Sequence, residues 1–312
     1  LITLILLSCS GKDTVEPLAL CTGPTQVLYD PLDSNDLLSY PDDWYTRPDE
    51  SSPTGHLIDL SVEKAPWTAN LGDVFSPIIE DIATRSGFAR LGAAVIRFTG
   101  TVPIGPTDPE DSLTDEGFIW LDLSVDPPER VAFTTSLGEE QNQLILKPVK
   151  PLRPGAQHLI AVTNAYKDVS GQCTAPSTLM SDILNRTASP EFDEQTERIH
   201  TALAMTDIDP NRISHLLTFT TQDDLGLFNE VAQTIAQNEY TWDSPLDCND
   251  ASPIYCQGRF TSNDYRTNGA IERTVYRIPS QQARSFAQVF FVFWANHNGT
   301  KPSLVAPTDF VD

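Results

Sequence analysis

Short stretches of alternating apolar and polar residues recur along the first two thirds of the chain. The clearest of them span residues 94–98, 117–123, 143–148, 158–163 and 213–221. Turns that contain glycine or proline separate them, at intervals of about a dozen residues or more. Side chains of a strand point alternately to its two faces, so this pattern predicts the strands of a β-sandwich.

Three segments have the apolar spacing of a helix instead. Ser76 and Pro77 are expected to begin the first helix as its N-cap and first helical residue, and Gly87 to end it. The second helix is predicted over residues 192–205, and the third begins after its N-cap, Asp223. The apolar stripes of the last two helices consist of Ile199, Ala202 and Leu203, and of Leu225, Phe228, Val231 and Ile235.

Two more strands are expected near the end of the sequence, over residues 274–278 and 288–294. The second of them is almost entirely apolar, which is typical of a strand buried on both faces. The pattern as a whole therefore predicts a mainly β protein with inserted helices.

Charge excludes one large class of partner. The 312 residues include 43 acidic and 20 basic side chains, which gives a formal net charge of −23 and an isoelectric point near 4.4. Such a surface repels the backbone of DNA or RNA, so we expect no nucleic-acid partner. Hydrophobic residues make up 40% of the chain, which is enough to form a core, and 24 prolines against 16 glycines argue against a helical bundle.

The first residues resemble the end of a bacterial lipoprotein signal peptide. An apolar run that is too short to span a bilayer leads to Ser8 and then Cys9. In lipoproteins a small residue precedes a cysteine that receives a diacylglyceryl group and becomes the mature N-terminus. We therefore expect a truncated signal peptide over residues 1–9, lipid attachment at Cys9 and a tether over residues 10–26. The alternative is an ordinary buried N-terminal strand.

The lipid would hold an exported protein at the cell envelope. Ser10 stands where the inner-membrane retention signal of enteric bacteria has aspartate, so the outer membrane of a Gram-negative bacterium is the favoured location.

The other four cysteines predict two disulfides, as in many exported proteins. Three connectivities are possible. Cys248 and Cys256 enclose a short loop that contains proline, so we expect them to pair with each other, which leaves Cys21 to pair with Cys173. A four-cysteine zinc site is disfavoured because no Cys-x-x-Cys spacing occurs, and no metal site is predicted.

No catalytic constellation emerges from the histidines, and neither a Gly-x-Ser-x-Gly nucleophile elbow nor a phosphate-binding glycine loop occurs. No two histidines have His-x-x-x-His or His-Glu-x-x-His spacing. His158 and His215 alternate with apolar strand residues and are expected to be exposed, and His200 is expected to form a surface pair with Glu197. The sequence predicts no cofactor and no catalytic residue among its 312 positions.

Two acidic runs leave weak calcium binding open. One spans residues 30–50 and the other residues 108–116. Neither follows the EF-hand pattern, so solvated acidic loops are the favoured interpretation. Trp44, Tyr45 and Trp67 could form an aromatic platform for a ligand, but we expect them to be core anchors.

Four motifs follow one another in a characteristic order. They are Tyr-Pro-Asp-Asp-Trp-Tyr-Thr at 40–46, a strand and Pro-Leu-Arg-Pro-Gly turn at 144–155, Leu-Ile-Ala-Val-Thr-Asn at 159–164 with Lys-Asp-Val-Ser-Gly at 167–171, and a closing strand at 217–222. In this order they resemble the N-terminal domain of bacterial virulence-factor lipases, an Ig-like module of large exported lipoproteins. The resemblance covers roughly residues 27–280, and because its motifs are turns it implies a fold more than an activity.

In that family an α/β-hydrolase domain usually follows, and it begins with an apolar strand and a His-Gly oxyanion turn. Here the strand at 289–294 leads to His297, but Asn298 separates it from Gly299. The resemblance thus implies that this chain is a fragment and that the catalytic machinery lies downstream of Asp312.

The resemblance implies an Ig-like β-sandwich with a helical insertion over residues 27–222. Residues 223–312 would form a connector helix, a disulfide-clipped segment and the first strands of an α/β-hydrolase-like domain. The implied function is the anchoring and scaffold part of an exported lipase or esterase, whose lipid or ester substrate would be met by the downstream domain. The alternative is a non-catalytic lipoprotein for surface binding or adhesion.

Overall fold

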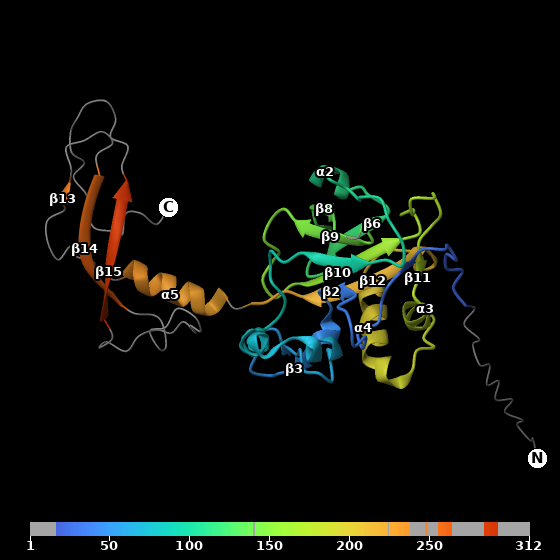
Figure 1. The fold of residues 1–312 in the computed structure, drawn as a ribbon, viewed down its shortest axis with the longest axis horizontal. Helices are drawn as coiled ribbons and strands as arrows, with labels where there is room; N and C mark the ends of the chain where they lie inside the picture. The colour runs from blue at the N-terminus through green and yellow to red at the C-terminus, as the bar shows by residue number, and fades with distance from the viewer. Residues whose placement is uncertain are drawn as a thin grey trace, which may run out of the picture. The chain divides into compact units, whose positions relative to one another are not determined.

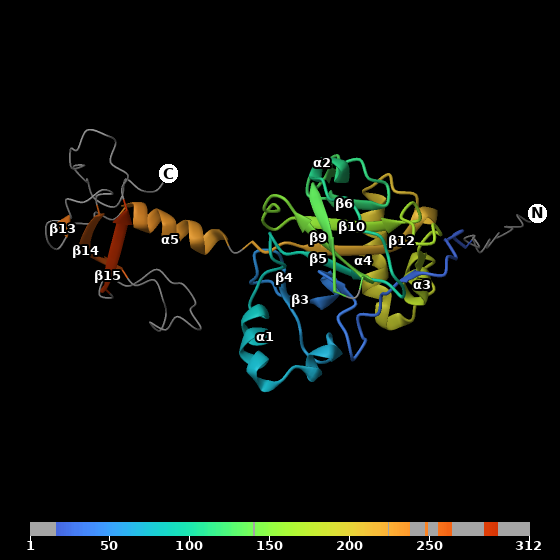
Figure 2. The same ribbon diagram turned by 45° about the horizontal axis from the view of Figure 1, so that its top comes forward.

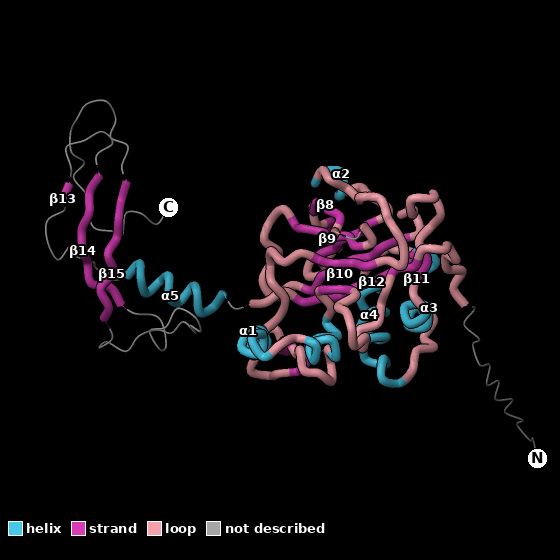
Figure 3. The backbone as a smooth tube through the Cα atoms, in the orientation of Figure 1, coloured by secondary structure: helices cyan, strands magenta, loops and turns pink. Residues whose placement is uncertain are grey.

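The computed structural model describes residues 17–139, 141–223, 225–237, 247–248, 255–263 and 284–292. The chain divides into two compact units, Leu1–Asp223 and Asp224–Asp312. In the first unit, strands occupy the centre and loops make most of the connections (Figures 1 and 3).

The first unit contains two four-stranded sheets that are antiparallel throughout. One has the strand order β12-β10-β6-β7 and the other has the order β2-β5-β9-β8. The strands of the first sheet are β6 (Phe118–Asp122), β7 (Glu129–Arg130), β10 (Gln157–Thr163) and β12 (Ile213–Thr220). Those of the second sheet are β2 (Ser39–Tyr40), β5 (Ala94–Arg97), β8 (Phe133–Leu137) and β9 (Gln143–Pro148).

One apolar core lies between these sheets. Phe118 and Trp120 of β6 are both 1% exposed, and Trp120 is paired in register with Ile160 of β10. Trp120 also contacts Phe133 of the other sheet, with ring centroids 5.8 Å apart. The two sheets therefore bury their facing side chains against each other.

Two helices cover the outer face of the first sheet at β12. The side chain of Ser177 accepts a hydrogen bond from the N–H of Met180 and caps α3 (Thr178–Leu184). Next comes α4 (Asp193–Ala204), whose apolar stripe is buried as its spacing predicts. Since β12 is covered on both faces, every residue of this strand except Thr220 is buried, and it shows no alternation of burial.

Smaller elements complete the first unit. They are the parallel pair of β1 (Gln26–Val27) and β11 (Ala175–Pro176), the hairpin of β3 (Thr46–Pro48) and β4 (His56–Ile58), and the helices α1 (Ser76–Ile82) and α2 (Pro109–Ser112). Figure 2 shows α1 below the sheets, on the same side as β3 and β4.

The second unit contains a helix and a three-stranded antiparallel sheet with the order β13-β14-β15. The helix is α5 (Leu225–Gln237), and the strands are β13 (Asp247–Cys248), β14 (Tyr255–Asn263) and β15 (Arg284–Val292). The predicted strand at 288–294 overlaps β15, whereas the one at 274–278 lies outside the described residues.

The strands predicted from alternation are confirmed within one or two residues as β5, β6, β9, β10 and β12. The structure as a whole is a mixed α/β fold with several antiparallel sheets and a few helices. Gly87 does not end the first helix, which stops at Ile82. A Cβ at Gly87 would lie 2.6 Å from the carbonyl oxygen of Thr220, so glycine lets the chain approach the end of β12.

Candidate functional site at the N-terminal junction

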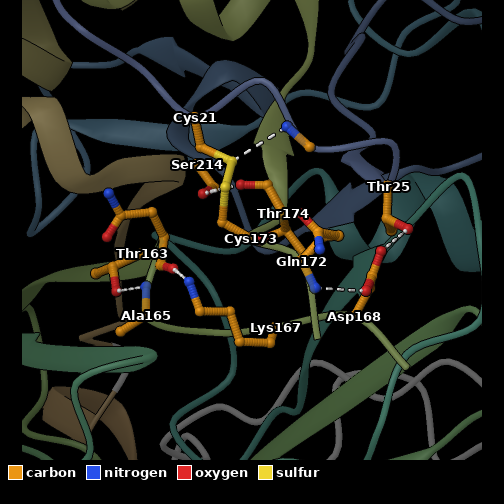
Figure 4. The surroundings of a disulfide bond; sticks show 12 residues. Cys21, Thr25, Thr163, Ala165, Lys167, Asp168, Gln172, Cys173, Thr174 and Ser214 are labelled. Atoms are coloured by element: carbon orange, nitrogen blue, oxygen red, sulfur yellow. Dashed lines mark hydrogen bonds between the residues drawn. A yellow bond between two sulfur atoms is a disulfide. The ribbon is translucent and has the colours of Figure 1, made fainter. Parts of the chain in front are cut away.

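A disulfide between Cys21 and Cys173 fastens the N-terminal segment to the rest of the first unit (Figure 4). The two Cα atoms are 6.4 Å apart, a normal separation for a disulfide. The pairing expected from the sequence is therefore confirmed. The approach also requires Gly23, since a Cβ at that position would lie 1.7 Å from the carbonyl oxygen of Cys173.

An aspartate organises the hairpin that leads to Cys173. One carboxylate oxygen of Asp168 accepts hydrogen bonds from the N–H and hydroxyl of Ser170 and from the N–H of Gln172. The other accepts from the hydroxyl of Thr25 at 2.9 Å (Figure 4). These hydrogen bonds lower the pKa of Asp168 to about 2, and the bond from the Ser170 hydroxyl has the largest effect. A charged carboxylate thus joins the hairpin to the segment that follows Cys21, a role that the sequence did not reveal.

Part of the expected tether is bound to the fold. The N–H of Leu18 donates to the side-chain oxygen of Asn185 at 2.8 Å, and that of Ala19 donates to Asn211 at 2.9 Å. Leu18 and Leu20 also pack against the core. The free tether expected over residues 10–26 can therefore extend no further than residue 17, because the chain is held from Leu18 onward.

A buried aspartate ties the following loop to α4. The carboxylate of Asp42 is 0% exposed and accepts hydrogen bonds, each 2.9 Å long, from the hydroxyl of Tyr29, the side-chain N–H of Gln195 and the backbone N–H of Trp44. Arg198 donates to Gln195 at 2.7 Å and extends the network. Burial outweighs these bonds and raises the pKa of Asp42 to about 6.

Asp43 makes the equivalent connection to β12. Its two carboxylate oxygens accept from the backbone N–H and the hydroxyl of Thr220, at 2.8 and 3.0 Å. Burial raises the pKa of Asp43 to about 6, with Arg198 acting in the opposite direction. The interpretation of residues 30–50 as a solvated acidic loop is therefore wrong for Asp42 and Asp43.

Replacing Asp43 by asparagine should separate the cost of its charge from its hydrogen bonds, because an amide can accept from the N–H of Thr220 and donate to its hydroxyl. With a folded pKa of about 6 against 3.8 unfolded, wild type binds an extra proton between these values and loses stability as the pH rises through them. We expect Asp43→Asn to be more stable than wild type at pH 7.5 by about 2 kcal/mol and equal to it near pH 4. Urea unfolding at both pH values measures this, and a difference that does not change with pH would contradict it.

The structure corrects the expectation for two histidines. His158 and His215 are both 0% exposed rather than facing solvent. His215 lies 3.1 Å from the hydroxyl of Ser39 and packs on Tyr29, and burial lowers the pKa of His215 to about 3. His158 stacks on Phe219 with ring centroids 5.2 Å apart. Both side chains lie on the same face of the sheet, and that face is the core rather than the solvent.

The other candidates have structural partners. His200 lies 3.0 Å from the carbonyl oxygen of Ile183, and Glu197, expected beside it, forms an ion pair with Arg186 instead. Trp44 and Tyr45 are 7% and 2% exposed and serve as core anchors, as expected. Within the described part of the chain, no group of three or more His, Cys, Asp or Glu is placed to hold a metal.

Cys9 and His297 lie outside the described residues. Cys248 and Cys256 are direct partners in the antiparallel register of β13 and β14. Opposed residues on neighbouring antiparallel strands are close enough to be bridged, so this register supports the second disulfide, which stays a prediction. No helix in the described ranges is both long and apolar enough to cross a bilayer.

In the first unit, a disulfide therefore fastens the N-terminal segment, and buried hydrogen-bond networks connect the loop that follows it to α4 and β12. No protein-family model and no curated protein matches the chain.

Among solved structures, the chain has a distant similarity to bacterial surface-layer protein SbsC. It covers 73% of this chain and 28% of the S-layer protein rSbsC at a TM-score of 0.24, and 75% of this chain and 31% of domains 1–6 of SbsC at 0.25, each with 8% identity. For the N-terminal part of SbsC it covers 73% of this chain and 47% of that one, also at 8% identity and at a TM-score of 0.23. The chain spans less than half of each of these proteins, and scores this low carry no argument about fold or function.

Proposed function

We propose that this chain is the anchoring and scaffold part of an exported bacterial lipase- or esterase-like lipoprotein. The observation that carries the proposal is the Cys21–Cys173 disulfide, which straps the segment following Cys9 to the body of the protein. Structural disulfides form in oxidising compartments outside the cytosol. A lipid on Cys9 would then hold the first unit at the envelope, with the outer membrane favoured, through the residues between Cys9 and Leu18.

The proposed fold of residues 27–222 is an Ig-like β-sandwich with a helical insertion. Two four-stranded antiparallel sheets that share one core support it, and α3 and α4 are the inserted helices. The motifs at 40–46 and 167–171, on which the resemblance rests, form the Asp42–Asp43 network and the Asp168 hairpin. Both hold the N-terminal segment in place, which suits a module that bears an anchor.

In this proposal, residues 223–312 connect the scaffold to a downstream catalytic domain. α5 is the connector. The strands β14 and β15 would begin the α/β-hydrolase-like domain, with Cys248 and Cys256 as register partners on β13 and β14. The sequence offers no nucleophile elbow within the chain, so the reacting serine would lie beyond Asp312 and act on a lipid or ester.

A fluorophosphonate probe tests this function on the product of the whole native gene, since it labels activated serines covalently. We expect one labelled serine, located beyond Asp312, together with hydrolysis of short p-nitrophenyl esters. The labelled serine replaced by alanine is the matched control and should lose both signals. A folded, membrane-bound gene product that neither reacts with the probe nor hydrolyses esters would contradict the proposal and favour the adhesion alternative.

A further inference from the structure

A cavity of about 360 Å³ lies on the outer face of the first sheet, at β6. Its floor consists of Ile119 and Leu121, which alternate along the strand with the core residues Phe118 and Trp120. Since successive side chains of a strand point to opposite faces, the floor faces away from the core between the sheets. The volume falls within the range of small-molecule sites in proteins, roughly 300–1,000 Å³.

The cavity lies where the cover over this face of the sheet ends. Leu159 and Ala161 of β10, the register partners of Leu121 and Ile119, are both 0% exposed, whereas Ile119 itself is only half-buried. Arg130 of β7 is the register partner of Leu121 on its other side, so its side chain projects on the same face. The floor and this flanking side chain therefore share one face, which is left open at β6.

Two loops form the apolar walls of the cavity. The loop after α4 contributes Ile208 and Met205, and Met205 is 43% exposed. The hydroxyl of Thr206 accepts from the N–H of Ile208 at 3.3 Å and donates to the carbonyl oxygen of Leu203 at 3.0 Å, so this wall is held to the helix. The Pro-Pro pair at 127–128 forms the other wall, and its rings restrict the backbone. The walls are thus preformed, and methionine lets one of them adapt to a ligand.

The two cations that line the cavity are already engaged. Arg130 donates through Nη1 to the carbonyl oxygens of Asp115 at 2.9 Å and Phe118 at 3.3 Å. Arg212 forms an ion pair with Glu116, with Nη2 and Oε2 2.8 Å apart. The nearby charges of Asp115 and Glu116 also favour the charged form of Arg130. The described lining therefore offers an anion no uncompensated positive charge.

Two carboxylates that line the cavity have no cationic partner among the described residues. Asp207 is exposed, and its side chain forms neither an ion pair nor a hydrogen bond there. One carboxylate oxygen of Asp209 accepts from the backbone and side-chain N–H groups of Asn211, at 2.9 and 3.0 Å, which leaves its charge unpaired. An apolar floor thus lies beside a rim with uncompensated negative charge.

We propose that this cavity binds a small organic cation, an ammonium group carried on a short aliphatic body. The floor and walls remove the aliphatic part from water, and every buried methylene adds to the affinity. Asp207 and Asp209 attract the ammonium group at the rim. The strongly acidic surface concentrates cations in general, and the apolar floor selects those that have an aliphatic body.

The two methionines of the chain give a direct readout of binding. Met205 lies in the wall of the cavity, whereas Met180 is 0% exposed beneath α3 and does not line it. In the full chain labelled with ¹³C at its methionine methyl groups, the NMR signal of Met205 should shift saturably on addition of hexylammonium. The signal of Met180 should stay in place and serves as the internal control.

Hexylammonium, hexanol and hexanoate carry the same chain on a cationic, a neutral and an anionic head, so they separate the two parts of the site. We expect the dissociation constant to rise in that order, by about tenfold between the first and the last at constant ionic strength. Ile119→Thr, which makes the floor more polar, should weaken the binding of all three.

The rim is tested by Asp207→Asn, which should raise the dissociation constant of hexylammonium about threefold and leave that of hexanol unchanged. Asp73→Asn is the matched control, because Asp73 is an exposed aspartate of η3 (Asp73–Phe75) that does not line the cavity, and it should bind like wild type. Asp207 is also exposed, so this pair remains a test if Ile119→Thr does not fold.

Three results would overturn the proposal. They are a Met205 signal that shifts no more than that of Met180, hexanol or hexanoate that binds as tightly as hexylammonium, and Asp73→Asn that weakens binding as much as Asp207→Asn.

Discussion

Replacing Cys21 and Cys173 together by serine is expected to lower the free energy of unfolding of the first unit by about 4 kcal/mol. The bond joins positions 152 residues apart, so it restricts a large part of the unfolded chain. It also positions two weaker contacts, the hydrogen bond of Thr25 to Asp168 and the two-residue pairing of β1 with β11. Loss of the disulfide should therefore loosen the whole N-terminal segment.

Denaturant unfolding of the whole protein, followed by tryptophan fluorescence, measures this effect. Each single serine variant should lose as much stability as the double variant, because either one removes the same bond. Reduced wild type should reproduce the loss. Variants within about 0.5 kcal/mol of oxidised wild type would show that the bond does not stabilise the fold.

Replacing Asp42 by alanine is expected to cost about 4 kcal/mol of unfolding free energy. The change leaves three buried donors without their acceptor, and each such group costs about 1–3 kcal/mol. These donors belong to the loop at Tyr29, to η1 (Asp43–Tyr45) at Trp44 and to α4 at Gln195. The loss should thus detach the loop from the helix rather than remove a single contact.

Two variants serve as controls for Asp42→Ala. Asp42→Asn keeps one acceptor oxygen and should cost less. Asp108→Ala removes an exposed aspartate that caps α2 through a 2.9 Å bond to the N–H of Glu110, and such caps are worth about 1 kcal/mol. Equal losses for Asp42→Ala and Asp108→Ala in urea unfolding would contradict the importance of the buried network.

Local patterns identified most strands, and their failures have physical causes. The bounds of β9 match the alternation of Leu144 and Leu146 with less buried neighbours. β8 was missed because Phe133 and Thr135 are its buried residues, and a threonine gives no apolar signal. α3 was missed because the segment is only 7 residues long, too short for its buried residues Met180, Ile183 and Leu184 to repeat the helical spacing.

The networks of the site could not be read from local sequence. Gln195 lies 153 positions from Asp42, and Thr220 lies 177 positions from Asp43, so their hydrogen bonds depend on the complete fold. The acidic composition of residues 30–50 suggested exposure, and nothing nearby in the sequence showed the donors. The disulfide pairing was easier to predict from the sequence, because four cysteines allow only three connectivities and the spacing of Cys248 and Cys256 favoured one of them.

Mass spectrometry of the N-terminal peptide, from the native protein isolated with the cell envelope, tests the lipid anchor most directly. The proposal predicts a mature chain that begins at Cys9 with a diacylglyceryl group on its sulfur, and a Cys9→Ala variant that lacks the lipid and is not retained at the membrane. Peptides that run through residue 9 with a free thiol, recovered from the mature protein, would contradict it.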